Sequence, residues 1–135
     1  MRVLICGGRD FNNPSFIRSA LENLLFVGGT IPSGLFIIEG AGPGVRGEPS
    51  CDELVYQWRM RNGLDGARYP VDHTKDGPWP GAGPRRNRRM LEESKPDRGI
   101  AFPGGKGTAG MVKLMRDIDL HVLELKPPNI KYGIA

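Results

Sequence analysis

The sequence predicts an α/β fold in which a parallel sheet of about five strands lies between two layers of helices. Short apolar runs alternate along the chain with longer segments whose apolar residues repeat at helical spacing. The apolar runs are largely continuous, as is typical of strands that are covered on both faces. Turns rich in glycine or proline separate most of these segments and indicate where strands and helices end.

The first strand and the first helix have clear signals. Residues 2–6 form the first apolar run, and we expect a strand there. Residues 14–25 are predicted to be helical, with Asn13 as the N-cap and Pro14 at the first helical position. The apolar face that would pack on the sheet comprises Phe16, Ile17, Ala20, Leu21, Leu24 and Leu25.

The middle of the chain is predicted to hold two strands, one helix and two long loops. The strands are expected at residues 35–39 and 67–70, and the helix runs from Ser50 or Asp52 to about Asn62, where Gly63 stops it. Residues 40–49 form a glycine-rich loop. Residues 71–83 form a second loop, which carries Trp79 between two prolines.

The remaining elements complete the alternation. We expect helices at residues 84–93 and 108–115 and strands at residues 99–102 and 121–125. Pro127 and Pro128 exclude a further helix or central strand. The predicted organisation is therefore one domain over residues 1–125 and a tail over residues 126–135.

Composition narrows the class of protein. The chain has 135 residues, of which 39% are hydrophobic and 25% charged, and these values are typical of a soluble globular domain. Its apolar runs fall well short of the roughly 18 residues of a membrane helix, and its N-terminus does not resemble a signal peptide. Cys6 and Cys51 lack metal-ligand spacing, so we expect a cytoplasmic protein without a metal or other cofactor. The net charge of +4 indicates an anionic partner.

The candidate site lies where the expected strands end, because ligands of parallel sheets bind beyond the carboxyl ends of the strands. The most informative segment is Pro103-Gly104-Gly105-Lys106-Gly107-Thr108, which joins a buried strand to a helix. Glycines let the backbone approach a phosphate, and the N-terminus of the helix presents amide N–H groups to it. Thr108 can cap the helix or donate its hydroxyl to the ligand. An ordinary tight turn is the alternative.

Arginines form the second candidate group. Residues 84–89 begin a helix and contain Arg85, Arg86, Arg88 and Arg89. Cationic side chains in the first turn of a helix interact unfavourably with the helix dipole, and a bound anion or an acidic side chain can offset this cost. We expect Arg86, with Asn87 beside it, to bind the ligand, and Arg85 and Arg89 to lie on a solvated basic face.

The other candidates follow the first two expected strands. Gly7, Gly8, Arg9 and Asp10 form the first loop, and Glu39 and Gly40 begin the second. Glu39 can bind a ribose hydroxyl or cap a neighbouring loop, and Asp52 is expected to cap its helix rather than to act in catalysis. Trp79 can stack on a base or cover the edge of the core.

Three blocks of the sequence resemble the YspA/YpsA-related branch of the SLOG superfamily. They are Gly7-Gly8-Arg9-Asp10-Phe11, residues 81–90 with Arg86 four positions before Met90, and residues 102–108. The resemblance implies a Rossmann-like fold, a nucleotide or nucleotide-derived ligand, and a homodimer. The superfamily also contains the LONELY GUY phosphoribohydrolases, the lysine decarboxylase-like proteins and the DprA-type DNA-binding proteins.

The sequence departs from the hydrolases at the position of their catalytic glutamate. Their glycine motif is followed, three residues after its threonine, by a catalytic glutamate, and that position here is Met111. The resemblance therefore favours binding or sensing of a nucleotide over an enzymatic function. The alternatives are a phosphoribohydrolase in which Asp10, Glu39 or Asp52 replaces the glutamate, and a DprA-like nucleic-acid binder.

Overall fold

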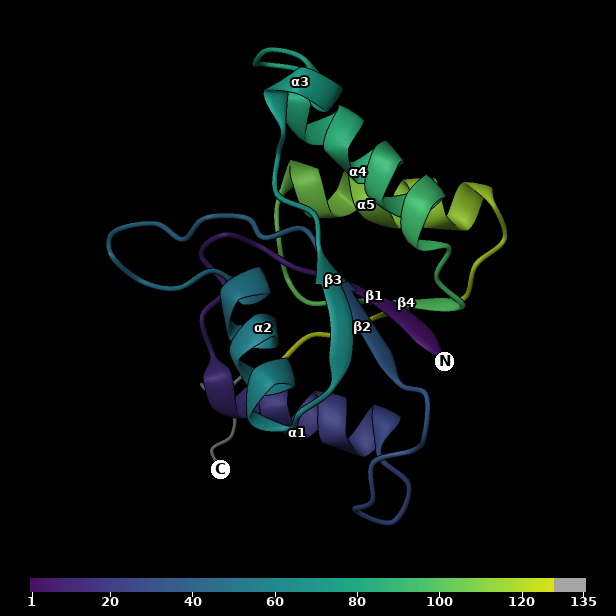
Figure 1. Ribbon diagram of the computed structural model, residues 1–135. Coiled ribbons are helices and arrows are strands. Elements are labelled where there is room, and N and C mark those ends of the chain that lie inside the picture. The colour runs from purple at the N-terminus through teal and green to yellow at the C-terminus, as the bar shows by residue number, and fades with distance from the viewer. Residues whose placement is uncertain (128–135) are drawn as a thin grey trace.

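Five parallel strands form the central sheet of the computed structural model, which describes residues 1–127 (Figure 1). The strands are β1 (Arg2–Cys6), β2 (Phe36–Glu39), β3 (Asp65–Arg68), β4 (Arg98–Ala101) and β5 (Val122–Glu124). Their order in the sheet is β3-β2-β1-β4-β5, so β1 lies at the centre with β2 and β4 beside it. Along the chain, β2 and β3 are added on one side of β1, and β4 and β5 are then added on its other side. In sheets of this kind a crevice forms at the carboxyl ends of the strands, where the direction of addition changes.

Helices cover both faces of this sheet. They are α1 (Pro14–Leu25), α2 (Cys51–Arg61), α3 (His73–Asp76), α4 (Ala82–Ser94) and α5 (Lys106–Asp117). In Figure 1, α1 and α2 lie on one side of the sheet and α4 and α5 on the other. The protein is thus a Rossmann-like three-layer α/β fold, as predicted.

The central strand shows why its sequence is apolar throughout. Val3 and Ile5 pack with α1 and α2, whereas Leu4 and Cys6 pack with α4 and α5. Successive side chains of a strand point to opposite faces, so a strand covered on both sides needs an apolar residue at every position.

Most element boundaries agree with the prediction, and β1 and α1 agree at both ends. The third strand lies at Asp65–Arg68 rather than at residues 67–70, because this partly exposed edge strand has little apolar pattern. The predicted loop at residues 71–83 contains α3 and the start of α4. Pro84 is tolerated inside α4 because residues of a first turn have no intrahelical partner for their N–H.

Within residues 1–127, no helix is both long enough and apolar enough to cross a membrane. Of the predicted tail, residues 128–135 lie outside the described part of the chain.

Candidate functional site

A cavity of about 1010 Å³ opens at the carboxyl ends of the strands. It is enclosed by the loops that follow β1 and β2, the start of α2, the segment before α4, and the starts of α4 and α5. Twelve of the fifteen predicted site residues line it: Gly7, Gly8, Arg9, Asp10, Gly40, Asp52, Arg86, Asn87, Gly105, Lys106, Gly107 and Thr108. The other three, Glu39, Pro103 and Gly104, are not among its lining residues.

Backbone hydrogen bonds bring three of these segments together. The Gly8 N–H donates to the Pro103 carbonyl over 2.8 Å, and the Gly8 carbonyl accepts from Cys51 N–H over 3.2 Å. The loop after β1 is thereby joined to the β4–α5 turn and to the start of α2. Gly104 permits this approach, because a Cβ there would lie 2.1 Å from the Thr108 hydroxyl and 2.8 Å from Gly8 N.

The N-terminus of α5 faces this cavity without a side-chain cap. Gly105 is the N-cap residue, and the first turn contains no acidic side chain. In the described residues, the amide N–H groups of Lys106, Gly107 and Thr108 have no acceptor. An N-cap role for Thr108 is therefore wrong, because the helix begins two residues earlier than predicted and the Thr108 side chain lies against Gly104.

Arg86 joins the start of α4 to the ends of two strands. Its Nη1 donates to the carbonyls of Gly40 and Tyr69, the latter over 3.0 Å, and its Nε donates to Asn87 Oδ1 over 2.9 Å. Partial burial lowers the pKa of the Arg86 guanidinium, which stays charged at neutral pH. Arg86 thus contributes positive charge to the cavity and also holds the chain at Gly40 and Tyr69 in place.

The prediction of a solvated basic face is wrong for Arg89, whereas Arg85 is exposed as predicted but also bonds to the protein. Arg89 forms a two-point ion pair with the buried Asp76 at 2.8 and 2.9 Å. Arg85 donates to the carbonyls of Asp76 and Pro78, the latter over 2.7 Å. The hydrogen bonds from Arg89 lower the pKa of Asp76 to about 2. Both arginines therefore hold the segment at residues 72–80 against α4.

Glu39 lies behind the cavity wall and caps the loop after β2. Its Oε1 accepts from Ala41 N–H over 2.6 Å, and its Oε2 accepts from Arg68 Nε over 2.6 Å. The side chain is buried, and burial raises its pKa to about 7. Of the two roles considered for Glu39, loop capping is the one that its contacts show.

Asp52 is a buried carboxylate on the cavity wall. The N-cap of α2 is Ser50, so the predicted capping role of Asp52 is wrong. Asp52 Oδ2 instead accepts from Gly42 N–H over 2.9 Å, while Oδ1 has no donor within the described residues. Burial raises the pKa of this carboxyl group. An oxygen with a remaining lone pair is therefore available to a ligand that carries a hydroxyl.

The loop after β2 forms another wall and adds positive charge. Arg9 Nε donates to the Pro43 carbonyl over 3.0 Å and so holds this loop beside the loop after β1. The charged side chains that line the cavity are Arg9, Arg46, Arg86, Lys106, Asp10 and Asp52. Four cations against two carboxylates make the cavity electropositive, and Arg46 is a lining residue that the sequence reasoning missed.

Trp79 and His73 also line the cavity, and both belong to the segment before α4. Trp79 is 63% exposed, which excludes the predicted alternative that it covers the edge of the core. His73 lies edge-on to it, with ring centroids 5.4 Å apart. The sequence reasoning did not assign His73 to the site, because the short helix that brings it to the rim was hidden in a predicted loop.

The thiol of Cys6 lies at the cavity wall but is chemically quiet. It is 8% exposed, and burial raises its pKa to about 12. A thiol with this pKa is protonated at neutral pH, whereas the thiolate is the nucleophile. No group of three or more His, Cys, Asp or Glu side chains in residues 1–127 is arranged to hold a metal ion.

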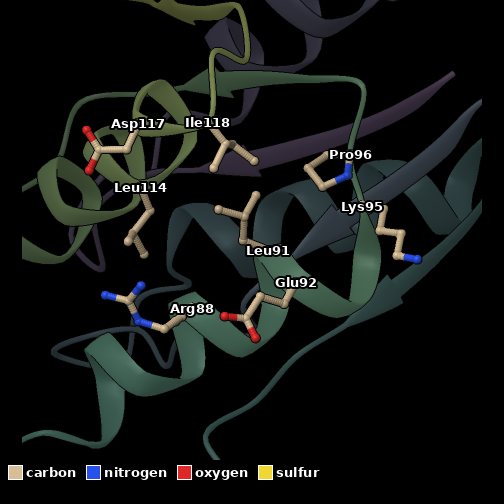
Figure 2. A pocket seen from close by; sticks show the side chains of 8 residues that line it. All are labelled: Arg88, Leu91, Glu92, Lys95, Pro96, Leu114, Asp117 and Ile118. Atoms are coloured by element: carbon tan, nitrogen blue, oxygen red, sulfur yellow. The ribbon is translucent and has the colours of Figure 1, made fainter.

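A second hollow, of about 450 Å³, lies between α4 and α5 and is shown in Figure 2. Leu91, Leu114 and Ile118 provide its apolar surface, with Arg88, Glu92, Lys95 and Asp117 around them. It contains none of the predicted site residues. The larger cavity is therefore the candidate functional site.

No protein-family model and no curated protein sequence matches this chain.

Proposed function

We propose that the cavity binds a nucleotide or a nucleotide-derived ligand through its phosphate group, as the resemblance to the SLOG superfamily suggests. The observation that carries the proposal is the start of α5. Three amide N–H groups that have no acceptor among residues 1–127 lie in an electropositive cavity, at Lys106 and the two residues after it, with no acidic side chain in the first turn. Helix N-termini of this kind stabilise phosphate oxygens through both hydrogen bonds and the helix dipole.

Asp52 favours a ligand that carries hydroxyl groups as well as an anion. A carboxylate repels phosphate, but its Oδ1 can accept a hydrogen bond from a hydroxyl. A ribose phosphate combines the two groups. The cavity volume is also at the upper end of the usual range for small-molecule sites, roughly 300–1,000 Å³, which leaves room for a whole nucleotide.

Hydrolysis of the N-glycosidic bond is the second candidate function. Asp52 favours it, because a buried carboxyl group with a raised pKa is suited to general acid–base catalysis. Met111, which is buried on the cavity wall, supplies no such group. We rank binding first for this reason.

Binding to nucleic acid has less support. Arg85, Arg86 and Arg89 are committed to hydrogen bonds within the protein. Of the four clustered arginines, only Arg88 forms no hydrogen bond or ion pair with a described residue. The cluster is thus poorly suited to form the free basic patch that tracks a phosphate backbone.

Titration calorimetry with AMP, cyclic AMP, ADP-ribose and inorganic phosphate tests the proposal on wild type and Gly105→Val. Gly105 has negative φ and open space where a Cβ would lie, so valine fits the fold but fills the anion position. We expect at least one ligand of the panel to bind wild type and to lose more than tenfold in affinity with Gly105→Val.

Gly110→Val is the matched control, because Gly110 is exposed on the same helix, has open space and does not line the cavity. We expect this variant to bind like wild type. Absence of binding to wild type across the panel, or equal binding by Gly105→Val, would contradict the proposal.

A further inference from the structure

We propose that Trp79, with His73 against its ring, is the stacking surface for the base of the bound nucleotide. The inference rests on the proposed function and assigns a binding surface to the part of the ligand that does not carry the phosphate. It identifies the ligand class as one that joins an aromatic base to an anionic group.

The first observation is the unusual exposure of this side chain. The large hydrophobic side chains that are exposed in residues 1–127 are Met1, Val27, Ile31, Met60, Trp79 and Ile118, and only Trp79 among them lines the cavity. The other tryptophan, Trp58, is 1% exposed and belongs to the core. Leaving an indole in water forgoes the stabilisation of its burial, so the position of Trp79 favours a role in contact with a ligand.

The second observation is that the segment carrying Trp79 is held in place. Arg85 donates to the carbonyl of Pro78, the residue immediately before Trp79, over 2.7 Å. Arg89 fixes Asp76 by two hydrogen bonds, and the His73 ring bonds to the Gly77 carbonyl over 2.7 Å. The backbone that leads into Trp79 is therefore held in place before a ligand arrives, which reduces the entropy lost on binding.

The third observation is the apolar and aromatic character of this rim. The His73 ring meets Trp79 at 74° with centroids 5.4 Å apart, an edge contact that leaves most of the indole exposed. Pro70 and Val71, which belong to the same segment of the chain, also line the cavity. Gly83 lies beside the indole, where a Cβ would come 3.8 Å from Trp79 Cζ3. A flat aromatic group suits these surroundings, whereas phosphate does not.

Charged side chains are unevenly distributed among the segments that line the cavity. The segment from Pro70 to Gly83 contributes no acidic or basic side chain other than His73 to the lining, whereas the start of α5 contributes Lys106 and amide N–H groups that have no acceptor within residues 1–127. A base on Trp79 and a phosphate on α5 would leave the ribose between them. Base–aromatic stacking tolerates different bases because each has a π face, so we expect the base to strengthen binding without strict selection of its identity.

Titrations of AMP and of ribose 5-phosphate into wild type, Trp79→Ala and Trp79→Phe test this inference. We expect Trp79→Ala to weaken AMP binding by about 5- to 150-fold, the effect typical of losing one stacked base, and to leave the affinity for ribose 5-phosphate unchanged. Trp79→Phe should retain most of the affinity for AMP. Met60→Ala is the control, because Met60 is 55% exposed and lies outside the cavity.

Tryptophan fluorescence provides a direct second measurement. AMP should quench the emission of wild type, and the quenching should disappear in Trp79→Phe, which retains only the buried Trp58. Equal affinities of wild type for AMP and ribose 5-phosphate, or normal AMP binding by Trp79→Ala, would overturn the stacking role and leave the phosphate site standing. Failure of wild type to bind either compound would overturn both proposals.

Discussion

Arg85, Arg86 and Arg89 show how one residue type in one helix turn serves distinct purposes. A run of arginines at a helix start suggests an anion site, yet two of the three form hydrogen bonds with groups of the protein itself. Arg89 forms an ion pair with Asp76, and Arg85 donates hydrogen bonds to two backbone carbonyls. Of these three arginines, only Arg86 lines the cavity and adds its charge there, and it also bonds to the chain just beyond the ends of two strands.

The pair of Asp76 and Arg89 predicts a dependence of stability on pH. Its folded pKa of about 2 lies below the ordinary value of 3.8, so the stabilisation is present above pH 4 and is lost as the pH falls towards 2. The shift corresponds to about 2 kcal/mol. We expect urea denaturation to show Asp76→Asn less stable than wild type by about this amount at pH 7, with the difference shrinking below pH 4. A difference that does not change with pH would contradict the assignment.

Met111 predicts that the protein binds nucleoside monophosphates without cleaving them. Loss of a group that transfers a proton or stabilises charge in the transition state costs roughly 10² to 10⁴ in rate, and a buried methionine can do neither. Incubation with AMP and chromatography should therefore reveal no free adenine at ordinary enzymatic rates.

Release of adenine at more than about one turnover per second would contradict this prediction. Asp52→Asn would then identify the acid, because Asp52 is the buried carboxylate on the cavity wall. Loss of turnover with retained AMP binding would assign the catalysis to it.

At the scale of elements, the loop after β2 depends on the start of α2. Ser50 is buried and has two roles: its Oγ accepts from Glu53 N–H over 3.1 Å and donates to the Gly42 carbonyl over 2.6 Å. One hydroxyl thus caps a helix and holds a wall of the cavity.

Ser50→Ala should therefore lower the free energy of unfolding by about 2 kcal/mol, because a cap and a buried hydrogen bond are lost together. Urea denaturation measures this change. Ser15→Ala is the control, since Ser15 is exposed and bonds only to the side chain of Asn13. An equal effect of the two substitutions would contradict the account of Ser50.

At the scale of the whole molecule, the sequence predicted the fold better than the contacts of the site. Strands buried on both faces leave continuous apolar runs, so β1 and β4 were easy to place, whereas the partly exposed β3 was displaced by two residues. The sequence also identified which residues come to the rim, because parallel strands bring their carboxyl ends to one edge.

What the sequence could not predict were partners distant along the chain. Glu39 pairs with Arg68, 29 positions away, and Arg86 bonds to a carbonyl 46 positions away. Such contacts depend on how loops pack and not on local pattern. Because of these contacts, Glu39 holds a loop in place, whereas Asp52 Oδ1 stays available to a ligand.

The resemblance also predicts a homodimer. Light scattering at micromolar concentration should give a mass near twice the chain mass of 14.8 kDa. We expect the partner to lie near the ligand rim, so a nucleotide should protect amides at the interface as well as in the cavity. A strictly monomeric mass near 14.8 kDa would refute this prediction.

The most direct test of the central claim is the response of individual backbone amides to a nucleotide. In ¹H–¹⁵N NMR spectra, addition of AMP should shift the amide signals of Lys106, Gly107 and Thr108 in a saturable manner, because these N–H groups have no acceptor within the described residues. Signals of residues that line the hollow between α4 and α5, such as Leu114 and Ile118, should stay in place. Unchanged signals at the start of α5, or saturable shifts confined to that hollow, would contradict the assignment of the nucleotide site.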